Sequence, residues 1–366
     1  MSLLKLLILN IPPPYGGGEV RAKILFDHFA GKEGYRTLIY THSKRSKSTQ
    51  GRFLLYNVIS NINLIARYTY IVIRLRPSLV FISIPKTFSA LLKVIPMIFL
   101  KFFLRYKLLG ELAGSSFYFL NSKPALRNIS IKLLKKFDSI RVLGQATKDY
   151  LCQYSITKSY VMDNGIAIPP EIKVPPKLLN RSSQVHLLYV GALNENKGTL
   201  IFPEIARILK QKEFDFIFDL VGEWSSHEEM DRFLAMIDGL NVRENFLMHG
   251  LVVDYSKWSY FKQADLFIFP SFNEGQPIVI LEALAFGIPI VSSGVGLIPE
   301  TITNGINGII IEQIQGSRFA QEIMFLLNDD KLYYEISANN IKLYQERYSK
   351  DTYIRNFNNW INSFLN

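Results

Sequence analysis

The chain has 366 residues, of which 48% are hydrophobic, and it carries a formal net charge of +11. This length is too great for one ordinary domain and suits two, while the single cysteine, Cys152, excludes an internal disulfide and fits a reducing compartment. No run of about 18 apolar residues is present, and the apolar start is typical of a buried first strand, so we expect neither a membrane-spanning segment nor a secretory signal.

The positive charge is concentrated in the first half of the chain. Residues 1–168 carry 25 Lys and Arg against 7 Asp and Glu, and no acidic residue lies between Glu33 and Glu111. Such asymmetry predicts a polyanionic partner for this half, either nucleic acid or an anionic membrane surface.

Apolar runs of strand length recur along the chain, with longer amphipathic stretches between most of them. In the first half these runs cover 4–10, 37–41, 79–83, 107–112, 139–144 and 159–164. In the second half they cover 185–191, 214–222, 245–250, 265–271, 288–293 and 307–312. Near-continuous apolar strands are typical of a parallel sheet that helices cover on both faces.

Residues 169–184 contain four prolines and predict a stiff linker between the two halves. We therefore predict an α/β fold with two Rossmann-like, doubly wound domains that face each other across a cleft. The predicted segments are a first domain over 1–168, the linker over 169–184, a second domain over 185–345 and a C-terminal helix over 346–366.

Residues 86–107 predict an amphipathic helix with a basic face. On a helical wheel Lys93, Lys101 and Arg105 share this face with Lys86 and Lys107, and Leu and Phe residues lie opposite. This composition is typical of a helix at a membrane surface, although a helix that covers its own sheet would also need an apolar face. Nucleic acid is the weaker alternative, because the sequence lacks a recognisable nucleic-acid-binding module.

The stretch 270–293 holds two acids, Glu274 and Glu282, in an otherwise apolar run. Pro277 fits the first position of a helix that runs to about Phe286. The free N–H groups of its first turn would make an anion site at the edge of a parallel sheet. Glu282 lies within the apolar part of this helix and needs hydrogen-bond donors, which ligand hydroxyls, solvent or a lysine would supply.

This stretch resembles the donor-site region of retaining glycosyltransferases of the GT-B fold, of the family 4 type. The resemblance covers nearly the whole chain and is most specific in the second domain. Further motifs that resemble the family in order are Gly16-Gly17-Gly18-Glu19, DNGI over 163–166, VGALNENKG over 190–198, LVGE over 220–223 and LMHGLV over 247–252.

The resemblance implies a nucleotide diphosphate sugar as donor. It implies catalytic roles for Glu274 facing the sugar, for Lys197 beside the diphosphate and for Glu111, the acid nearest to the sugar wall. The donor-binding residues that it implies are Gly17, Gly18, Lys197, His249, Gly250, Glu274, Gly275, Ile278, Val279 and Glu282. Because no D-x-D motif is present, we expect no metal and no cofactor.

Two positions depart from the family pattern. Ala192 replaces an arginine after the strand glycine, and Ala113 replaces a histidine that lines the sugar pocket. We predict transfer with retention to a lipid-linked or growing glycan acceptor in cell-surface polysaccharide assembly. The protein would be cytoplasmic and peripheral on the inner face of the membrane. The alternatives are a catalytically weak glycan-binding or scaffold paralogue and a nucleotide-sugar epimerase of the same fold.

Overall fold

The structure is a computed structural model that describes residues 4–10, 17–40, 55–84, 91, 94–114, 120, 122–172, 174–180, 183–252 and 254–365. The chain divides into two compact units. Unit 1 comprises Met1–Ala167 with Lys350–Asn366, and unit 2 comprises Ile168–Ser349. The division therefore lies next to the predicted end of the first domain, and the C-terminal helix packs with unit 1.

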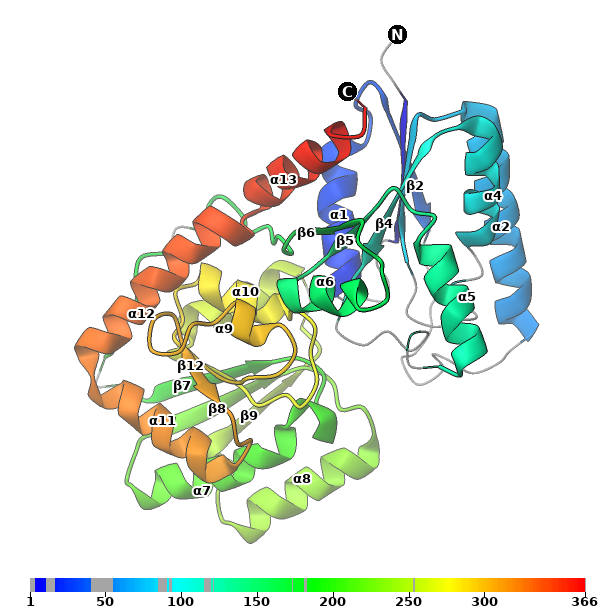
Figure 1. The fold of residues 1–366 in the computed structure, drawn as a ribbon. Helices are drawn as coiled ribbons and strands as arrows, with labels where there is room; N and C mark the ends of the chain where they lie inside the picture. The colour runs from blue at the N-terminus through cyan, green and yellow to red at the C-terminus, as the bar shows by residue number, and fades with distance from the viewer. Residues whose placement is uncertain are drawn as a thin grey trace. The chain divides into compact units, whose positions relative to one another are not determined.

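Unit 1 is built on a six-stranded parallel sheet with the strand order β2-β1-β3-β4-β5-β6 (Figure 1). The strands are β1 (Lys5–Asn10), β2 (Tyr35–Tyr40), β3 (Leu79–Ser83), β4 (Lys107–Leu112), β5 (Ser139–Val142) and β6 (Ser159–Val161). The helices are α1 (Gly17–Phe29), α2 (Leu55–Leu75), α4 (Ile95–Leu104), α5 (Pro124–Leu134), α6 (Gln145–Cys152) and α13 (Lys350–Asn362). The strand order reverses between β1 and β3.

Helices cover both faces of this sheet, as its apolar strands require. One face packs against α2, α4 and α5, where Val72, Met97 and Leu134 are buried against strand residues. The other face packs against α1 and α13, which join one core cluster with Phe81. The rings of Phe81 and Phe357 meet edge to face at 5.1 Å, so α13 is part of the core of unit 1.

Unit 2 repeats this plan with the parallel strand order β12-β11-β10-β7-β8-β9. The strands are β7 (Val185–Val190), β8 (Phe216–Val221), β9 (Phe246–Gly250), β10 (Leu266–Phe269), β11 (Ile290–Ser293) and β12 (Ile309–Ile311). The helices are α7 (Phe202–Gln211), α8 (His227–Gly239), α9 (Trp258–Gln263), α10 (Ile278–Ala285), α11 (Gly316–Asn328) and α12 (Asp330–Leu343). Here the strand order reverses between β7 and β10.

Each predicted strand run overlaps a strand of the structure, although β2 begins at Tyr35, two residues before its predicted run, and the α/β class with two doubly wound units is confirmed. The predicted cleft between the units stays a prediction. No helix in the described ranges has the length and the apolar character that crossing a bilayer requires.

The predicted helix over 86–107 is wrong at its C-terminal end. Helix α4 ends at Leu104, Arg105 follows in a left-handed conformation with φ of 56°, and Lys107 is the first residue of β4. The strand prevails there because β4 pairs with β3, so that Leu108 lies beside Val80 in the centre of the sheet. The basic face that included Lys107 therefore does not exist as predicted.

Candidate active site

Two loops of unit 2 meet where its strand order reverses, at the carboxyl ends of β7 and β10. Such a reversal is where doubly wound sheets bind ligands. The backbone N–H of Phe272 donates to the carbonyl of Asn196 at 3.0 Å. Gly198 has φ of +74°, and a Cβ there would lie 2.0 Å from the carbonyl oxygen of Pro270. Only glycine fits such a close approach, so the two loops are locked together.

These loops bring together Lys197 and Glu274, which the sequence predicted to act at one site. The Lys197 ammonium is ion-paired with Glu274 Oε1, and Ser271 Oγ donates to the same oxygen at 2.9 Å. The Lys197 side chain keeps 30% of its exposure, against 11% for Glu274. The cation is therefore accessible to a ligand, and its partner is fixed beside it.

Helix α10 follows this loop and carries the other predicted donor-binding groups. Pro277 caps the helix in an extended conformation and makes no side-chain cap hydrogen bond, so it precedes the helix rather than occupying its first turn. The backbone N–H groups of Ile278 and Val279 thus begin a helix whose dipole favours an anion. Gly275 lies just before, and its carbonyl accepts from the Leu297 N–H at 3.0 Å.

Glu282 lies inside α10 and is 2% exposed. Its Oε1 accepts a hydrogen bond from Lys257 Nζ at 2.6 Å, whereas its Oε2 is buried and has no hydrogen-bond partner. Burial raises the pKa of Glu282, and Lys257 opposes that rise. A buried oxygen without a donor is costly, so this carboxylate has capacity for one more hydrogen bond.

Lys257 was not found by sequence reasoning. It ends a short 3₁₀ helix over Asp254–Lys257, and its ammonium lies 4.5 Å from the centre of the Trp258 ring. Its contact with Glu282 spans 25 residues of sequence. The sequence indicated only that the buried Glu282 needs a hydrogen-bond donor. Lys257 is the residue that supplies it.

His249 and Gly250 end β9, and His249 is engaged within the sheet. Asp219 on β8 binds both imidazoles, with 2.7 Å from its Oδ1 to His249 Nε2 and 2.7 Å from its Oδ2 to His186 Nδ1. Gly250 has φ of +69° and accepts from the Gly222 N–H at 2.8 Å. Contact of His249 and Gly250 with a nucleotide base stays a prediction. An aspartate inside an apolar strand was the missed signal for this cluster.

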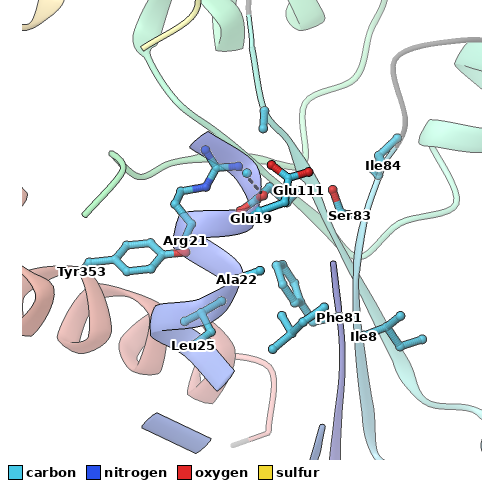
Figure 2. A pocket seen from close by; sticks show the side chains of 13 residues that line it. Ile8, Glu19, Arg21, Ala22, Leu25, Phe81, Ser83, Ile84, Glu111 and Tyr353 are labelled. Carbon is cyan, nitrogen blue, oxygen red and sulfur yellow. Dashed lines mark hydrogen bonds and ion pairs between the residues drawn. The ribbon is translucent and has the colours of Figure 1, made fainter. Parts of the chain in front are cut away.

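Unit 1 holds a cavity of about 460 Å³ at its own reversal of strand order, between β1 and β3. Gly18 and Glu19 from the start of α1 line it, together with Ser83 at the end of β3, Glu111 from β4 and Ala113, which directly follows β4. Figure 2 shows Glu19, Ser83 and Glu111 at one end of the cavity and apolar side chains at the other. Gly17 is the first residue of α1.

Glu111 lies at the centre of a buried ion network. Arg21 donates to its Oε1 at 2.8 Å, and Arg141 is ion-paired with its Oε2. Burial alone would raise the pKa of Glu111, but the two guanidinium groups hold it below its usual range. Arg141 also donates to the carbonyl oxygens of Met162 and Asp163, at 3.1 and 2.7 Å. With both oxygens engaged, Glu111 is placed to hold the scaffold, and its predicted catalytic role stays a prediction.

The predicted membrane residues fall in different settings. Lys93 lies outside the described residues. Lys101 turns toward its own unit, where its ammonium is 2.7 Å from Asp138 Oδ2 and donates to the carbonyl of Lys136 at 2.8 Å. Arg105 is exposed directly after α4.

No group of three or more His, Cys, Asp or Glu side chains is arranged to hold a metal ion among the described residues. Glu282, Glu274 and Glu111 are paired with Lys257, Lys197, Arg21 and Arg141. Lysine and arginine are the cations that the structure places beside these carboxylates.

Residues 171–343 match the family described as Glycosyl transferases group 1. A D-inositol 3-phosphate glycosyltransferase of Paenarthrobacter aurescens is 28% identical over 151 residues, which are 41% of this chain and 37% of that protein. The capsular polysaccharide biosynthesis glycosyltransferase CapM of Staphylococcus aureus is 25% identical over 189 residues, 52% of this chain and 48% of CapM. The matches thus span about half the length of these relatives or less.

Solved structures match over nearly the whole chain. Anabaena Alr3699/HepE in complex with UDP superposes with a TM-score of 0.72 and 16% identity, covering 98% of this chain and 100% of that one. The same protein has also been solved with UDP-glucose. At this identity the likeness concerns the fold, and it is the GT-B glycosyltransferase fold that the sequence predicted.

Proposed function

Residues 171–343 match the glycosyl transferases group 1 family, and we propose on that basis that the chain is a retaining glycosyltransferase that uses a nucleotide diphosphate sugar. The observation that carries this proposal is the buried Oε2 of Glu282, which has no hydrogen-bond partner. A ribose hydroxyl of the donor supplies the missing hydrogen bond. The Lys197 ammonium and the first turn of α10 balance the charge of the diphosphate.

The ion pair of Lys197 and Glu274 gives both residues a role in the transfer. A bound diphosphate competes for the Lys197 ammonium and frees Glu274 to accept a hydrogen bond from a hydroxyl of the donor sugar. The bond from the anomeric carbon to the phosphate oxygen then breaks, and the acceptor oxygen bonds to the same face of that carbon. The acceptor proton passes to a phosphate oxygen, so the protein contributes positioning and charge stabilisation.

The acceptor in this proposal is a lipid-linked or growing glycan used in cell-surface polysaccharide assembly. The cavity of unit 1 supports it, because Glu19 and Ser83 line it and Arg21 presents a buried Nε without a hydrogen-bond partner. Such groups suit sugar hydroxyls. The protein works without a metal and without nucleic acid, as a peripheral protein on the cytoplasmic face of the membrane, and CapM is a relative whose name refers to capsular polysaccharide.

The proposal is tested with labelled UDP-, GDP- and ADP-sugars, with the anomeric configuration of the product read by NMR. We expect one of these donors to be consumed with retention and at an undiminished rate in excess EDTA. Glu274→Gln should reduce turnover more than nucleoside diphosphate affinity, whereas Glu335→Gln, at an exposed position of α12, should change neither. An inverted product, or activity lost on chelation and restored by Mg²⁺, would contradict the proposal.

Two other results would point to the alternatives. Release of a free epimerised sugar would mark a nucleotide-sugar epimerase. Nucleotide or glycan binding without any turnover would mark a binding or scaffold protein. Ala113 and Ala192, which depart from the family pattern, would then be the first residues to test as the cause of the lost activity.

A further inference from the structure

Helix α4 exposes a cluster of three phenylalanines, which we call the Phe cluster. Phe99, Phe102 and Phe103 are 63%, 81% and 61% exposed. Their spacing places them on one face of the helix, and the ring of Phe103 lies 4.9 Å from that of Phe99 and 5.4 Å from that of Phe102. Grouped exposed aromatic side chains of this kind mark an interaction surface rather than a solvated face.

The neighbouring helix α2 adds to the apolar character of this side of unit 1. It packs beside α4 on the same face of the sheet (Figure 1), and Ile62, Tyr70 and Ile73 on it are exposed. With Ile95 and the Phe cluster, these two helices hold seven of the eighteen large hydrophobic side chains that are exposed among the described residues. Packing of α2 and α4 on the core of unit 1 does not explain these seven side chains, because they are exposed to solvent.

Positive charge surrounds the C-terminal end of α4. Arg105 and Lys107 follow it directly and are exposed. The bond from Lys101 to the carbonyl of Lys136 brings the exposed Lys135 and Lys136 beside the helix. Neither α2 nor α4 contains an acidic residue, and Lys101 neutralises the nearby Asp138.

We propose that the Phe cluster inserts into the interface of an anionic lipid bilayer, with the surrounding lysines and arginines on the headgroups. Aromatic side chains beside a basic rim are what a bilayer interface accommodates. A nucleic acid would match the charge but would leave the Phe cluster in water. The inference deepens the peripheral location proposed above, and it moves the contact from the predicted basic face to the aromatic one.

The test is co-sedimentation of the full chain with vesicles of phosphatidylcholine alone and of phosphatidylcholine with phosphatidylglycerol. We expect binding to the anionic vesicles, a partial loss as salt rises because surface charges are screened, and a residual part that salt does not remove. The triple variant Phe99→Gln, Phe102→Gln, Phe103→Gln should bind at least tenfold more weakly. The matched control changes three exposed apolar residues of unit 2, Leu178→Gln, Ile306→Gln and Phe325→Gln, and should bind like the wild type.

Charge and insertion are separated by a second pair of changes. Lys135→Glu with Lys136→Glu should weaken binding at low salt and leave the salt-resistant part intact. Urea unfolding of every variant shows whether unit 1 is folded, and nucleoside diphosphate binding shows that the site of unit 2 is intact. If the wild type did not bind nucleoside diphosphate, the proposed transferase activity would be contradicted, whereas the vesicle result would still test the membrane contact independently.

Two outcomes would overturn the inference. One is equal vesicle binding by the wild type and the Phe triple variant. The other is a concentration-dependent dimer of the wild type that the Phe triple variant abolishes, without vesicle binding by either, because a second copy of the chain would then cover the Phe cluster.

Discussion

Glu111 in unit 1 and Glu282 in unit 2 are both buried carboxylates in doubly wound units, and they differ in what their oxygens contact. Both oxygens of Glu111 are bound by arginines. Glu282 has one oxygen on Lys257 and the other without a partner. The pKa of the first is lowered by its arginines, and that of the second is raised by burial. A carboxylate whose hydrogen bonds are complete holds a fold together, whereas an incomplete one marks a place for a ligand.

The largest effect that follows from this comparison is on stability, from Glu111→Gln. Removing the charge leaves Arg21 and Arg141 buried without their anion, and breaking a buried pair of this kind costs about 3–5 kcal/mol. Urea unfolding measures this loss. Affinity for nucleoside diphosphate should stay unchanged.

The same loss should follow acidification. Because the pKa of Glu111 is lowered in the folded protein, its contribution to stability is present above the unfolded pKa of about 4.3 and is lost as pH falls through the lower folded value. Glu33→Gln, at an exposed position, is the control and should stay within about 0.5 kcal/mol of the wild type. An unfolding midpoint of Glu111→Gln equal to that of the wild type would show that the network is not structural.

The second effect is on affinity, from Glu282→Gln. Its Oε2 accepts a ligand hydroxyl in the proposed site, and a hydrogen bond to a charged group contributes about 1.5–3 kcal/mol. Nucleoside diphosphate should therefore bind roughly 10- to 100-fold more weakly, as calorimetry would measure. If the variant bound as tightly as the wild type, Glu282 would only be the partner of Lys257.

The third effect is on stability and its pH dependence, and comes from Lys257→Met. It tests the contrast between the raised pKa of Glu282 and the lowered pKa of Glu111. Without the ammonium the Glu282 carboxylate is buried with no cation, which should cost about 2 kcal/mol at pH 8. The raised pKa means that protonation relieves this cost, so stability is present at low pH and is lost as pH rises through the folded pKa.

The deficit of Lys257→Met relative to the wild type should therefore shrink between pH 8 and pH 5, as urea unfolding at each pH would show. Lys262→Met, at an exposed position on the next helix, is the control with no such dependence. A deficit that is the same at both pH values would mean that Lys257 contributes packing on Trp258 rather than charge.

The strands could be predicted from the sequence because their apolar runs are local and bounded by turns. That Lys197 and Glu274 belong to one site could be predicted as well, since both lie in recognisable motifs at one edge of a parallel sheet, but their ion pair was not predicted. The arginines of Glu111 could not, because they lie 90 and 30 residues away. Lys257 could not be predicted for the same reason. The partner of a buried carboxylate is set by the tertiary structure, and the hydrophobic periodicity of the sequence carries no information on it.

The helix over 86–107 failed for a different reason. A helical wheel places side chains correctly only within a helix, and it contains no information on where the helix ends. Helix α4 ends at Leu104, and Arg105 follows it in a left-handed conformation. Lys101 on the predicted basic face is used inside unit 1, and the exposed face is the apolar one.

The smallest effect concerns the cavity of unit 1 and comes from Ala113→His. Ala113 lines this cavity together with Ser83 and Glu111. An imidazole there would add one hydrogen bond to a sugar held in this cavity, and a bond made only in the transition state that is worth about 1.4 kcal/mol corresponds to a tenfold rise in turnover. Steady-state kinetics measures it, with unchanged nucleoside diphosphate affinity as the control. A fall in turnover would mean that Ala113 makes room for a bulkier sugar or acceptor.

The most direct test of Glu282 as the ribose-binding group is a cycle of two proteins and two ligands. The wild type and Glu282→Gln are each titrated with UDP and with 2′,3′-dideoxy-UDP, or with the corresponding GDP or ADP pair if that base binds better. The wild type should prefer the ribonucleotide roughly 10- to 100-fold, and the variant should lose most of this preference, since the two changes remove the same hydrogen bond. An equal preference in both proteins would contradict a ligand hydroxyl on Glu282 Oε2.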